Sequence, residues 1–209
     1  MTGLLLSHIF VRPNEEYKFH WVQNALKKYL DLEQDFFIVL SGHGIKPPKY
    51  ITDKCNEIFW ITDIKENELG RGHPYFCIKG FEICQLNNCE FTLKNRAYDY
   101  IENKDIFKHN LLVTEQTDLD KKIIGDLLMY GKTDYLLNWW NKSEWDYSTN
   151  GLSNLYEKKF DNFSDNAVFM NPQQIGWKTF EDNSTDFWGK QKGYEWYGGK
   201  GLKNAIDIS

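Results

Sequence analysis

Cys89-Glu-Phe-Thr-Leu-Lys-Asn-Arg-Ala-Tyr-Asp-Tyr-Ile101 joins a short apolar run to two bases and an acid. The run from Phe91 to Leu93 has the length and residue types of a buried strand. Lys94, Arg96 and Asp99 follow at the point where such a strand would leave its sheet. Because open α/β sheets bind ligands at the carboxyl ends of their strands, these charged residues form a candidate phosphate and metal site.

The composition of the chain is that of an ordinary globular protein. It has 209 residues, of which 41% are hydrophobic and 26% are charged, which is enough for one well-buried domain. The net charge of -5 argues against a general nucleic-acid binder. No stretch approaches the roughly 18 apolar residues of a membrane span, and the first residues lack the features of a signal peptide. We therefore expect a cytoplasmic protein without a transmembrane segment.

The first part of the chain has the pattern of a βαβ unit. Leu4–Val11 and Phe36–Leu40 are apolar runs of strand length, and an amphipathic helix is expected between them over residues 15–30. This order predicts two parallel strands joined by a right-handed crossover. A third buried strand is expected at Ile58–Ile61.

Two glycines flank a histidine directly after the second predicted strand. Ser41, Gly42, His43 and Gly44 could form a tight turn with an exposed backbone at the carboxyl end of that strand. A nucleotide base or phosphate could approach such a turn. A short Gly-x-Gly is weak evidence alone, and a simple turn without a ligand explains the segment equally well.

A second glycine-containing segment, Glu68-Leu-Gly-Arg-Gly-His-Pro74, precedes an apolar-periodic stretch that ends at Leu86. Pro74 suits the first turn of a helix, so the residues before it are expected to form a flexible loop at a helix N-terminus. Free backbone N–H groups and Arg71 would make this loop an anion site. His73 is a further candidate at this site, although a lone histidine is more often a structural hydrogen-bonding residue.

The segment from residue 111 to 128 predicts a strand and a helix. Leu111–Val113 is a short strand, and a helix with one apolar face is expected from Thr117 onward. Gly125 and Asp126 either lie inside this helix or form a loop before a later helix start. Asp126 is the candidate acid–base residue, with local capping or pairing as the alternative.

Aromatic residues dominate the rest of the chain. A helix over residues 135–140 is expected, capped by Thr133 or Asp134, with its aromatic stripe in the core. Gly131-Lys132-Thr133 lacks the upstream glycine spacing of a P-loop, so we expect no ATP site there. Beyond residue 141 periodicity is poor and helix breakers are frequent, which predicts short helices and loops over one end of the sheet.

The order of these parts resembles the nucleotide-sugar-binding half of a GT-A glycosyltransferase. In particular, Lys121-Lys-Ile-Ile-Gly-Asp-Leu-Leu-Met-Tyr-Gly-Lys-Thr-Asp-Tyr-Leu136 resembles the Gly-Asp, aromatic, Gly-Lys-Thr segment of the WavE-like lipopolysaccharide-synthesis glycosyltransferases. The resemblance covers residues 3–140. It implies an α/β fold, with a Rossmann-type, mostly parallel sheet flanked by helices. Residues 1–140 would form the nucleotide-sugar-binding core, and residues 141–209 an aromatic, loop-rich, acceptor-side extension of the same domain.

The resemblance also implies an activity: transfer of a sugar from a nucleotide-sugar donor to a glycan or polysaccharide acceptor. A divalent metal, Mn²⁺ or Mg²⁺, would bridge Asp99 and the donor diphosphate, and Asp126 would deprotonate the acceptor hydroxyl. The sequence departs from the family pattern in one respect, because no second carboxylate follows Asp99 until Glu102. The expected donor-binding residues are Ser41, Gly42, His43, Arg71, His73, Lys94 and Arg96.

Other functions stay open on the sequence alone. The lone acid and the short chain are compatible with a non-catalytic carbohydrate-binding or interaction protein on a degenerate α/β scaffold. Lys94, Arg96 and Asp99 could also form a solvated turn with an exposed ion pair. A hydrolase that uses His43 or His73 is disfavoured, because the chain has no Gly-x-Ser-x-Gly elbow and no paired metal-ligand histidines.

Overall fold

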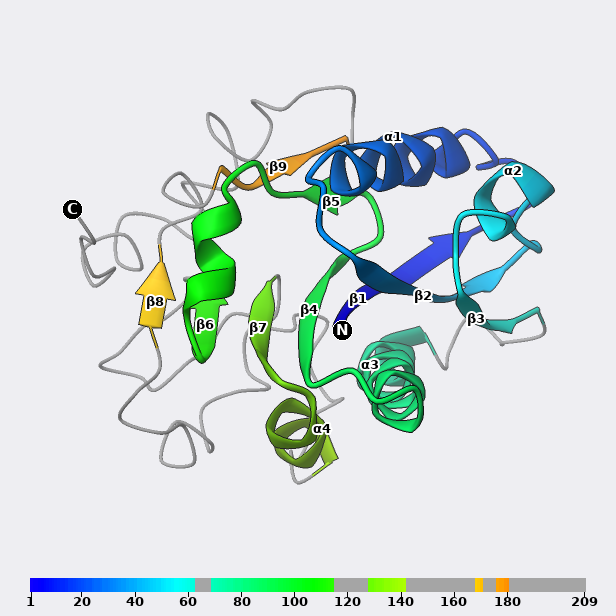
Figure 1. Cartoon of the computed structure of the whole chain (residues 1–209). Coiled ribbons are helices and arrows are strands. Elements are labelled where there is room, and N and C mark those ends of the chain that lie inside the picture. Colours follow the sequence, from blue (N-terminus) through cyan, green and yellow to red (C-terminus); the bar gives the residue numbers. More distant parts are fainter. Residues whose placement is uncertain (63–68, 115–127, 142–167, 171–175, 181–209) are drawn as a thin grey trace, which may run out of the picture.

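The computed structural model describes residues 1–62, 69–114, 128–141, 168–170 and 176–180 (Figure 1). The strands are β1 Thr2–Val11, β2 Phe36–Gly44, β3 Glu57–Ile61, β4 Phe91–Arg96, β5 Asp99–Tyr100, β6 Leu111–Thr114, β7 Met129–Lys132, β8 Val168–Met170 and β9 Lys178–Thr179. The helices are α1 Lys18–Leu30, α2 Lys49–Thr52, α3 Leu69–Leu86 and α4 Thr133–Asn141, with a 3-10 helix at Lys104–Lys108. No helix within these ranges is long and apolar enough to cross a membrane.

The main sheet has seven strands in the order β3-β2-β1-β4-β7-β6-β8. β3, β2, β1 and β4 are parallel to one another, β7 is antiparallel to both of its neighbours, and β8 is parallel to β6. The predicted parallel βαβ unit and the mostly parallel sheet are therefore confirmed. The chain adds β2 and β3 on one side of β1 and then returns to place β4 on the other side. A topological switch point thus lies between β1 and β4.

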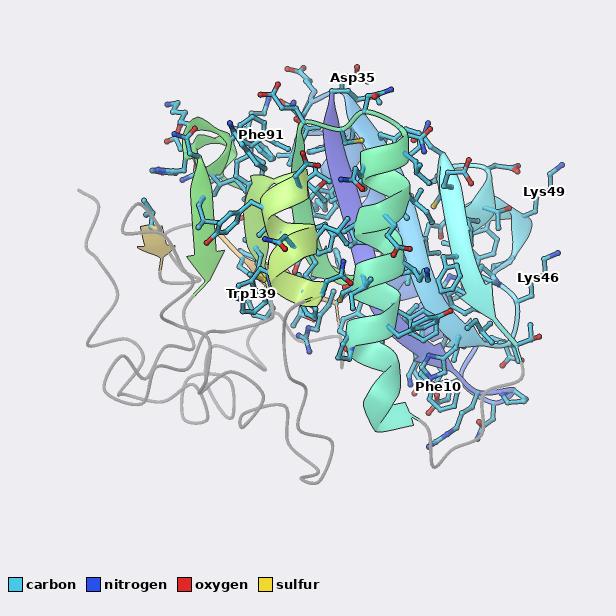
Figure 2. All side chains as sticks on the ribbon, turned by 90° about the horizontal axis from the view of Figure 1, so that it is seen from below. Phe10, Asp35, Lys46, Lys49, Phe91 and Trp139 are labelled. Atoms are coloured by element: carbon cyan, nitrogen blue, oxygen red, sulfur yellow. The ribbon has the colours of Figure 1, made fainter. Side chains whose placement is uncertain are left out.

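Helices cover both faces of this sheet. In Figure 1, α1 lies on one face, whereas α3 and α4 lie on the other, and Figure 2 shows α3 and α4 side by side. A second sheet of two strands, β5 and β9, packs beside α1. Figure 2 also shows the two ends of the sheet: Phe10 lies at the carboxyl end of the parallel strands, and Asp35 and Phe91 lie at the amino end.

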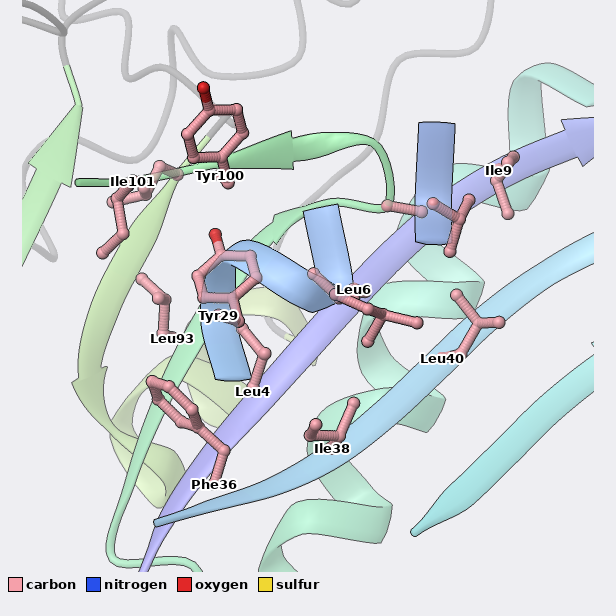
Figure 3. Packing of buried hydrophobic residues seen from close by; sticks show 14 of the residues in the cluster. Leu4, Leu6, Ile9, Tyr29, Phe36, Ile38, Leu40, Leu93, Tyr100 and Ile101 are labelled. Atoms are coloured by element: carbon pink, nitrogen blue, oxygen red, sulfur yellow. The ribbon is translucent and has the colours of Figure 1, made fainter. Parts of the chain in front are cut away.

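The predicted amphipathic helix is confirmed as α1. Val22, Leu26 and Tyr29 are fully buried, and they pack with Leu4 and Phe36 of the sheet in the cluster of Figure 3. Each such side chain contributes about 1.5–3 kcal/mol through burial. The helix begins at Lys18 rather than near residue 15. The residues before it form turns, in which the N–H of Lys18 donates to the carbonyl of Glu15 at 2.9 Å.

The prediction of a loop before Pro74 is wrong. Helix α3 begins at Leu69, so the backbone of residues 70–73 is helical and Pro74 lies inside the helix. The helix then packs closely on the sheet at Gly80, where a Cβ atom would lie 2.2 Å from a methyl group of Leu5. A glycine is required at this position because the helix and β1 approach so closely.

Strand β7 is absent from the expectations drawn from the sequence. Met129–Lys132 lies between β4 and β6, directly after the helix that had been expected to reach Leu128. The run is only four residues long and contains a glycine, so its pattern does not indicate a strand. The predicted helix after it is confirmed as α4, and the predicted strand at Leu111–Val113 is confirmed as β6. Trp139 and Trp140 of α4 are buried in the core, as expected.

Two short segments of the C-terminal half are described, and both join the rest of the fold. Val168–Met170 extends the main sheet as β8, and Lys178–Thr179 pairs with β5 as β9. The predicted helix from Thr117 lies outside the described residues. The division of the chain at residue 140 stays a prediction.

Candidate functional site

The carboxyl ends of β1 and β4 separate at the switch point. Pairing between these strands ends where Ser7 faces Arg96, whereas β1 and β2 stay paired as far as Val11 and Gly44. The register of β1 on β2 shifts between Leu6 and Ile9, which is where β4 leaves the sheet. In α/β proteins ligands bind outside the carboxyl ends of the strands at such a switch point. The end of β4 is therefore the candidate site.

Arg96 and Asp99 form a buried ion pair at this end of β4. Nε of Arg96 donates to Oδ2 of Asp99 at 2.7 Å, and Nη2 donates to Oδ1 at 3.3 Å. The Asp99 side chain is 0% exposed and that of Arg96 is 13% exposed. The sequence alternative of a solvated turn with an exposed pair is therefore wrong. The fork-like contact fixes the guanidinium in one orientation.

Aromatic rings hold the Arg96 guanidinium on the side of the sheet covered by α1. Its carbon lies 5.0 Å from the ring centroid of Tyr98 and 5.7 Å from that of Trp177. The ring of Trp21 in α1 meets Tyr98 edge-on at 6.0 Å. Such cation–π contacts contribute about 0.5–2 kcal/mol, with the larger values at desolvated sites. Arg96 is thus held by two rings, and Trp21 of α1 packs against one of them.

Asn95 connects these groups to the core. Its amide nitrogen donates to the Tyr29 hydroxyl at 2.7 Å. Its side-chain oxygen accepts from the backbone N–H of Arg96 at 2.9 Å and from Nε1 of Trp177 at 3.3 Å. Burial raises the pKa of Tyr29 well above its usual range, although the Asn95 bond opposes this shift. The sequence reading missed Asn95, Tyr29 and Trp177. Only Asn95 carried a signal, as a polar residue between the two bases.

The pKa of Asp99 reflects opposing effects. Burial raises it above its ordinary value, while Arg96, a hydrogen bond from Thr179 and the charge of Lys94 act against this rise. Thr179 belongs to β9, which pairs with β5 directly at Asp99. The carboxylate is therefore enclosed by its own strand, its neighbouring cation and a segment from the far end of the sequence.

Lys94 lies on the opposite face of the sheet from Asn95. Its side chain is fully buried, and Nζ lies 5.5 Å from the ring centroid of Trp140 in α4. Its positive charge still acts on Asp99, because it opposes the rise in the pKa of that carboxyl that burial causes. Lys94 therefore adds positive potential near the end of β4, but it belongs to the α3 and α4 face.

The prediction of a turn at Ser41–Gly44 is wrong. β2 continues through these residues, and both Ser41 and His43 are buried. The ring of His43 stacks on Phe10 at 4.5 Å and on Phe76 at 5.1 Å. Burial lowers the pKa of His43 to about 4, so the imidazole is neutral at pH 7.

The two glycines of this segment are explained by packing. A Cβ atom on Gly42 would lie 2.5 Å from the carbonyl oxygen of Ile9. Gly44 has a φ of +103°, which disfavours other residues, and a Cβ there would meet the carbonyl oxygen of Val11 at 2.1 Å. Neither glycine therefore needs a ligand to account for it.

Three other predicted site residues cannot be placed. Arg71 and His73 lie on the backbone of α3, but their side chains are outside the described residues. Asp126 lies in the segment 115–127, which is also outside them. Among the described residues of the expected cleft, the structure brings together Arg96 and Asp99, with Lys94 within electrostatic reach.

A second charged cluster, which the sequence reading missed, follows β1. Glu15 accepts a hydrogen bond from Nζ of Lys18 at 2.7 Å, and its other oxygen lies 3.9 Å from Nη1 of Arg12. Burial alone would raise the pKa of Glu15, but the hydrogen bonds and charges of Lys18 and Arg12 together lower it. The Arg12 side chain is 48% exposed, so this cluster also places a cation at the carboxyl end of the sheet.

The contacts of Asp99 do not fit a metal site. Both of its oxygens bond to Arg96, and no surface of the side chain is exposed. Hard divalent cations take six or more oxygen ligands, several of them carboxylates, carbonyls or waters. Among the described residues, no group of three or more His, Cys, Asp or Glu side chains is arranged to hold a metal ion.

The opposite, amino end of the sheet carries a polar cavity of about 490 Å³. Nε2 of Gln85 donates to Oδ1 of Asp134 across it at 2.9 Å. The cavity lies at the start of β4, far along the strand from Arg96. Its lining residues are Gln85, Asn88, Cys89, Glu90, Lys132 and Asp134.

A solved glycosyltransferase has a similar fold. The crystal structure of a glycosyltransferase involved in the glycosylation of the major capsid of PBCV-1 gives a TM-score of 0.50 at 11% identity, covering 88% of this chain and 95% of that chain. The galactosyltransferase LgtC, in complex with donor and acceptor sugar analogues, gives a TM-score of 0.45 at 9% identity, over 83% of this chain and 74% of that chain. No family model and no curated protein matches the sequence. The sheet and its neighbours thus define an α/β protein with a GT-A-like, glycosyltransferase fold.

Proposed function

We propose that the protein is a glycosyltransferase of the hexosyltransferase type, which moves a sugar from a nucleotide-sugar donor to a glycan or polysaccharide acceptor. One observation carries the proposal: a guanidinium fixed by Asp99 lies at the carboxyl end of β4, beside the switch point of a GT-A-like sheet. The leaving group of such a reaction is a nucleoside diphosphate, and stabilising its developing negative charge is the main catalytic task.

Arg96 is proposed to bind the donor diphosphate, with Lys94 adding positive potential from beneath the sheet. A preorganised cation stabilises developing charge without reorganising during the reaction, and the Asp99 fork and the two rings supply that preorganisation. Ser41, Gly42 and His43 are proposed to support this end of the sheet through packing. From the sequence, Arg71 and His73 are also proposed to contact the donor.

Asp126 is proposed as the general base that removes a proton from the acceptor hydroxyl. A carboxylate in this role must lie within hydrogen-bond reach of the hydroxyl, directly or through one water. The aromatic residues beyond 141 are proposed to line the acceptor side, because aromatic faces suit sugar rings. We also propose that the protein acts as a WavE-like glycosyltransferase in polysaccharide biosynthesis and is located in the cytoplasm.

A thermal-shift series tests the proposal. UDP, GDP, CMP and their sugars are each added with and without Mn²⁺ or Mg²⁺. A nucleotide that binds only the folded protein stabilises it by about 2.7 kcal/mol at 100 times its Kd. We expect one nucleotide class to raise the Tm, and the effect to fall in Arg96→Lys. Lys108→Ala, at an exposed pair with Asp105, is the matched control and should respond as wild type.

A non-catalytic carbohydrate-binding protein is the second candidate. It is favoured by the burial of Ser41 and His43, whose side chains fill the region where a nucleotide had been expected. This candidate predicts that no nucleotide changes the Tm, whereas glycans that contact the aromatic C-terminal half do. The nucleotide series therefore separates the two functions.

A further inference from the structure

We propose that Asp99 is a positioning residue, which holds Arg96 as a fixed cation for the donor diphosphate, so that donor binding needs no divalent metal at this carboxylate. The inference rests on the proposed function and deepens it, because it states how the same site compensates the charge of the donor. It replaces the metal-ligand role that the sequence predicted for Asp99.

The first step of the argument is the cost of freeing Asp99. Both carboxylate oxygens contact Arg96, at 2.7 and 3.3 Å, and the side chain has no exposed surface. A metal at Asp99 would have to displace these bonds and would leave the mostly buried guanidinium without its counter-ion. Breaking a buried ion pair in this way is strongly unfavourable. A single carboxylate also binds Mg²⁺ or Mn²⁺ too weakly to offset that loss.

The second step concerns the cation. The Asp99 fork uses two of the five N–H groups of the guanidinium, and the rings of Tyr98 and Trp177 lie 5.0 and 5.7 Å from its carbon. These contacts restrict the side chain before any ligand binds, which lowers the entropy cost of binding. A planar guanidinium also suits phosphate oxygens better than a lysine does.

The third step concerns net charge. Lys94 and Arg96 are cations and Asp99 is an anion, and the charge of Lys94 reaches Asp99. The three side chains together therefore keep one net positive charge at the end of β4. A diphosphate approaching this point meets a positive potential without an added ion.

Isothermal titration calorimetry on the wild-type protein tests the inference directly. UDP, GDP and CDP are titrated in EDTA and again in Mn²⁺ or Mg²⁺. We expect the best nucleotide to bind in EDTA with a Kd within about threefold of its value with metal, a difference under about 1 kcal/mol. Binding that requires metal, or tightens tenfold or more with it, overturns the inference and leaves the proposed function intact. No binding of any nucleotide in either condition overturns the proposed function, and the inference with it.

Asp99→Asn separates a positioning residue from a metal ligand. The amide keeps one acceptor oxygen and the size of the side chain, but it weakens the hold on Arg96. If Asp99 is a positioning residue, Asp99→Asn should weaken nucleotide binding by about tenfold, equally in EDTA and in Mn²⁺. If Asp99 is a metal ligand, Asp99→Asn should bind nucleotide in EDTA as the wild type does and should lose any gain in affinity from Mn²⁺. That result would overturn the inference.

Two further variants keep the test independent of folding. Asp105→Asn removes an exposed acid that also has a cation three residues away, and it should bind nucleotide as wild type does. Arg96→Lys keeps the charge but loses the fork, and it should weaken binding in both conditions alike. If Asp99→Asn does not fold, as judged by circular dichroism, the wild-type comparison and Arg96→Lys decide the question.

Discussion

Two segments look alike in the sequence and differ in the structure: Ser41–Gly44 after the second predicted strand, and Lys94–Asp99 after the fourth. Both place polar residues where a strand was expected to end. β2 continues through Gly44 and buries His43 between Phe10 and Phe76. β4 ends at Arg96 and then turns back to place Asp99 against α1. The first segment is therefore part of the core, and the second is a charged site.

The difference lies in how far each strand stays paired with β1. β1 extends to Val11 and supplies pairing partners for β2 as far as Gly44, so the polar residues of β2 stay inside the sheet. β4 stops pairing with β1 where Ser7 faces Arg96, although β1 itself continues to Val11, so the residues after Arg96 leave the sheet. A strand ends where its pairing ends, and a single strand's own residues carry little information about that point.

The largest expected effect comes from breaking the Arg96–Asp99 pair. Arg96→Ala leaves a fully buried carboxylate without its counter-ion, and it should lower the free energy of unfolding by about 3–5 kcal/mol. Lys108→Ala breaks an exposed pair with Asp105, and it should cost less than about 1 kcal/mol. Urea unfolding measures both. Equal costs for the two variants would contradict the contrast between buried and exposed pairs.

Acidification tests the other segment. Burial lowers the pKa of His43 to about 4, so folding disfavours its charged form. The stability from neutral His43 is complete above its unfolded pKa and is lost as the pH falls toward the folded pKa. Lowering the pH from 8 to 5 should therefore reduce the free energy of unfolding by about 2 kcal/mol through His43.

The matched variants for that test are His43→Phe and His20→Gln. His43→Phe keeps an aromatic ring between Phe10 and Phe76, and it should lose the part of the pH dependence that His43 causes. His20 is exposed, and His20→Gln should lose as much stability between pH 8 and 5 as the wild type does. Chemical unfolding at both pH values gives the comparison, and identical slopes for wild type and His43→Phe would show that His43 is not buried as a neutral group.

A smaller effect is expected from Trp177. Trp177→Phe keeps a ring beside Arg96 but removes the N–H that donates to Asn95 at 3.3 Å. The variant should lose about 0.5–1.5 kcal/mol of stability. An unchanged free energy of unfolding would mean that this bond to Asn95 contributes nothing to the hold on β4.

The smallest effect concerns the cluster after β1. The cations around Glu15 lower its pKa, so its contribution to stability is present above the unfolded pKa and is lost as the pH falls through the folded pKa. Glu15→Gln should therefore cost less than about 1 kcal/mol at pH 7, and the cost should shrink as the pH falls through the folded pKa. Salt should reduce the cost further, because the neighbouring Arg12 is half exposed. A salt-independent cost would indicate packing instead of charge.

Much of the fold was predictable from periodicity. The strands β1 to β4 and β6 and the helices α1 and α4 follow apolar patterns long enough to recognise. β7 was not, because Met129–Lys132 owes its conformation to strands on both sides. The start of α3 was misplaced because Pro74 usually marks a first turn, whereas here the helix begins at Leu69.

The candidate site was predictable only in part. Lys94, Arg96 and Asp99 were identified because charged residues follow an apolar run. Their roles depend on Tyr29 and Trp177, which lie far away in the sequence and meet Asn95 only in the folded protein. The burial of Asp99 depends on Thr179 of β9 in the same way.

Hydrogen–deuterium exchange tests the location of the donor site most directly. The protein is measured alone and with the nucleotide that gives the largest thermal shift. We expect slower exchange in peptides that cover the end of β1 and residues 94–100, which flank the switch point. Slower exchange confined to residues 85–90 and 132–134, around the polar cavity at the amino end, would contradict the assignment of the site to the carboxyl end of β4.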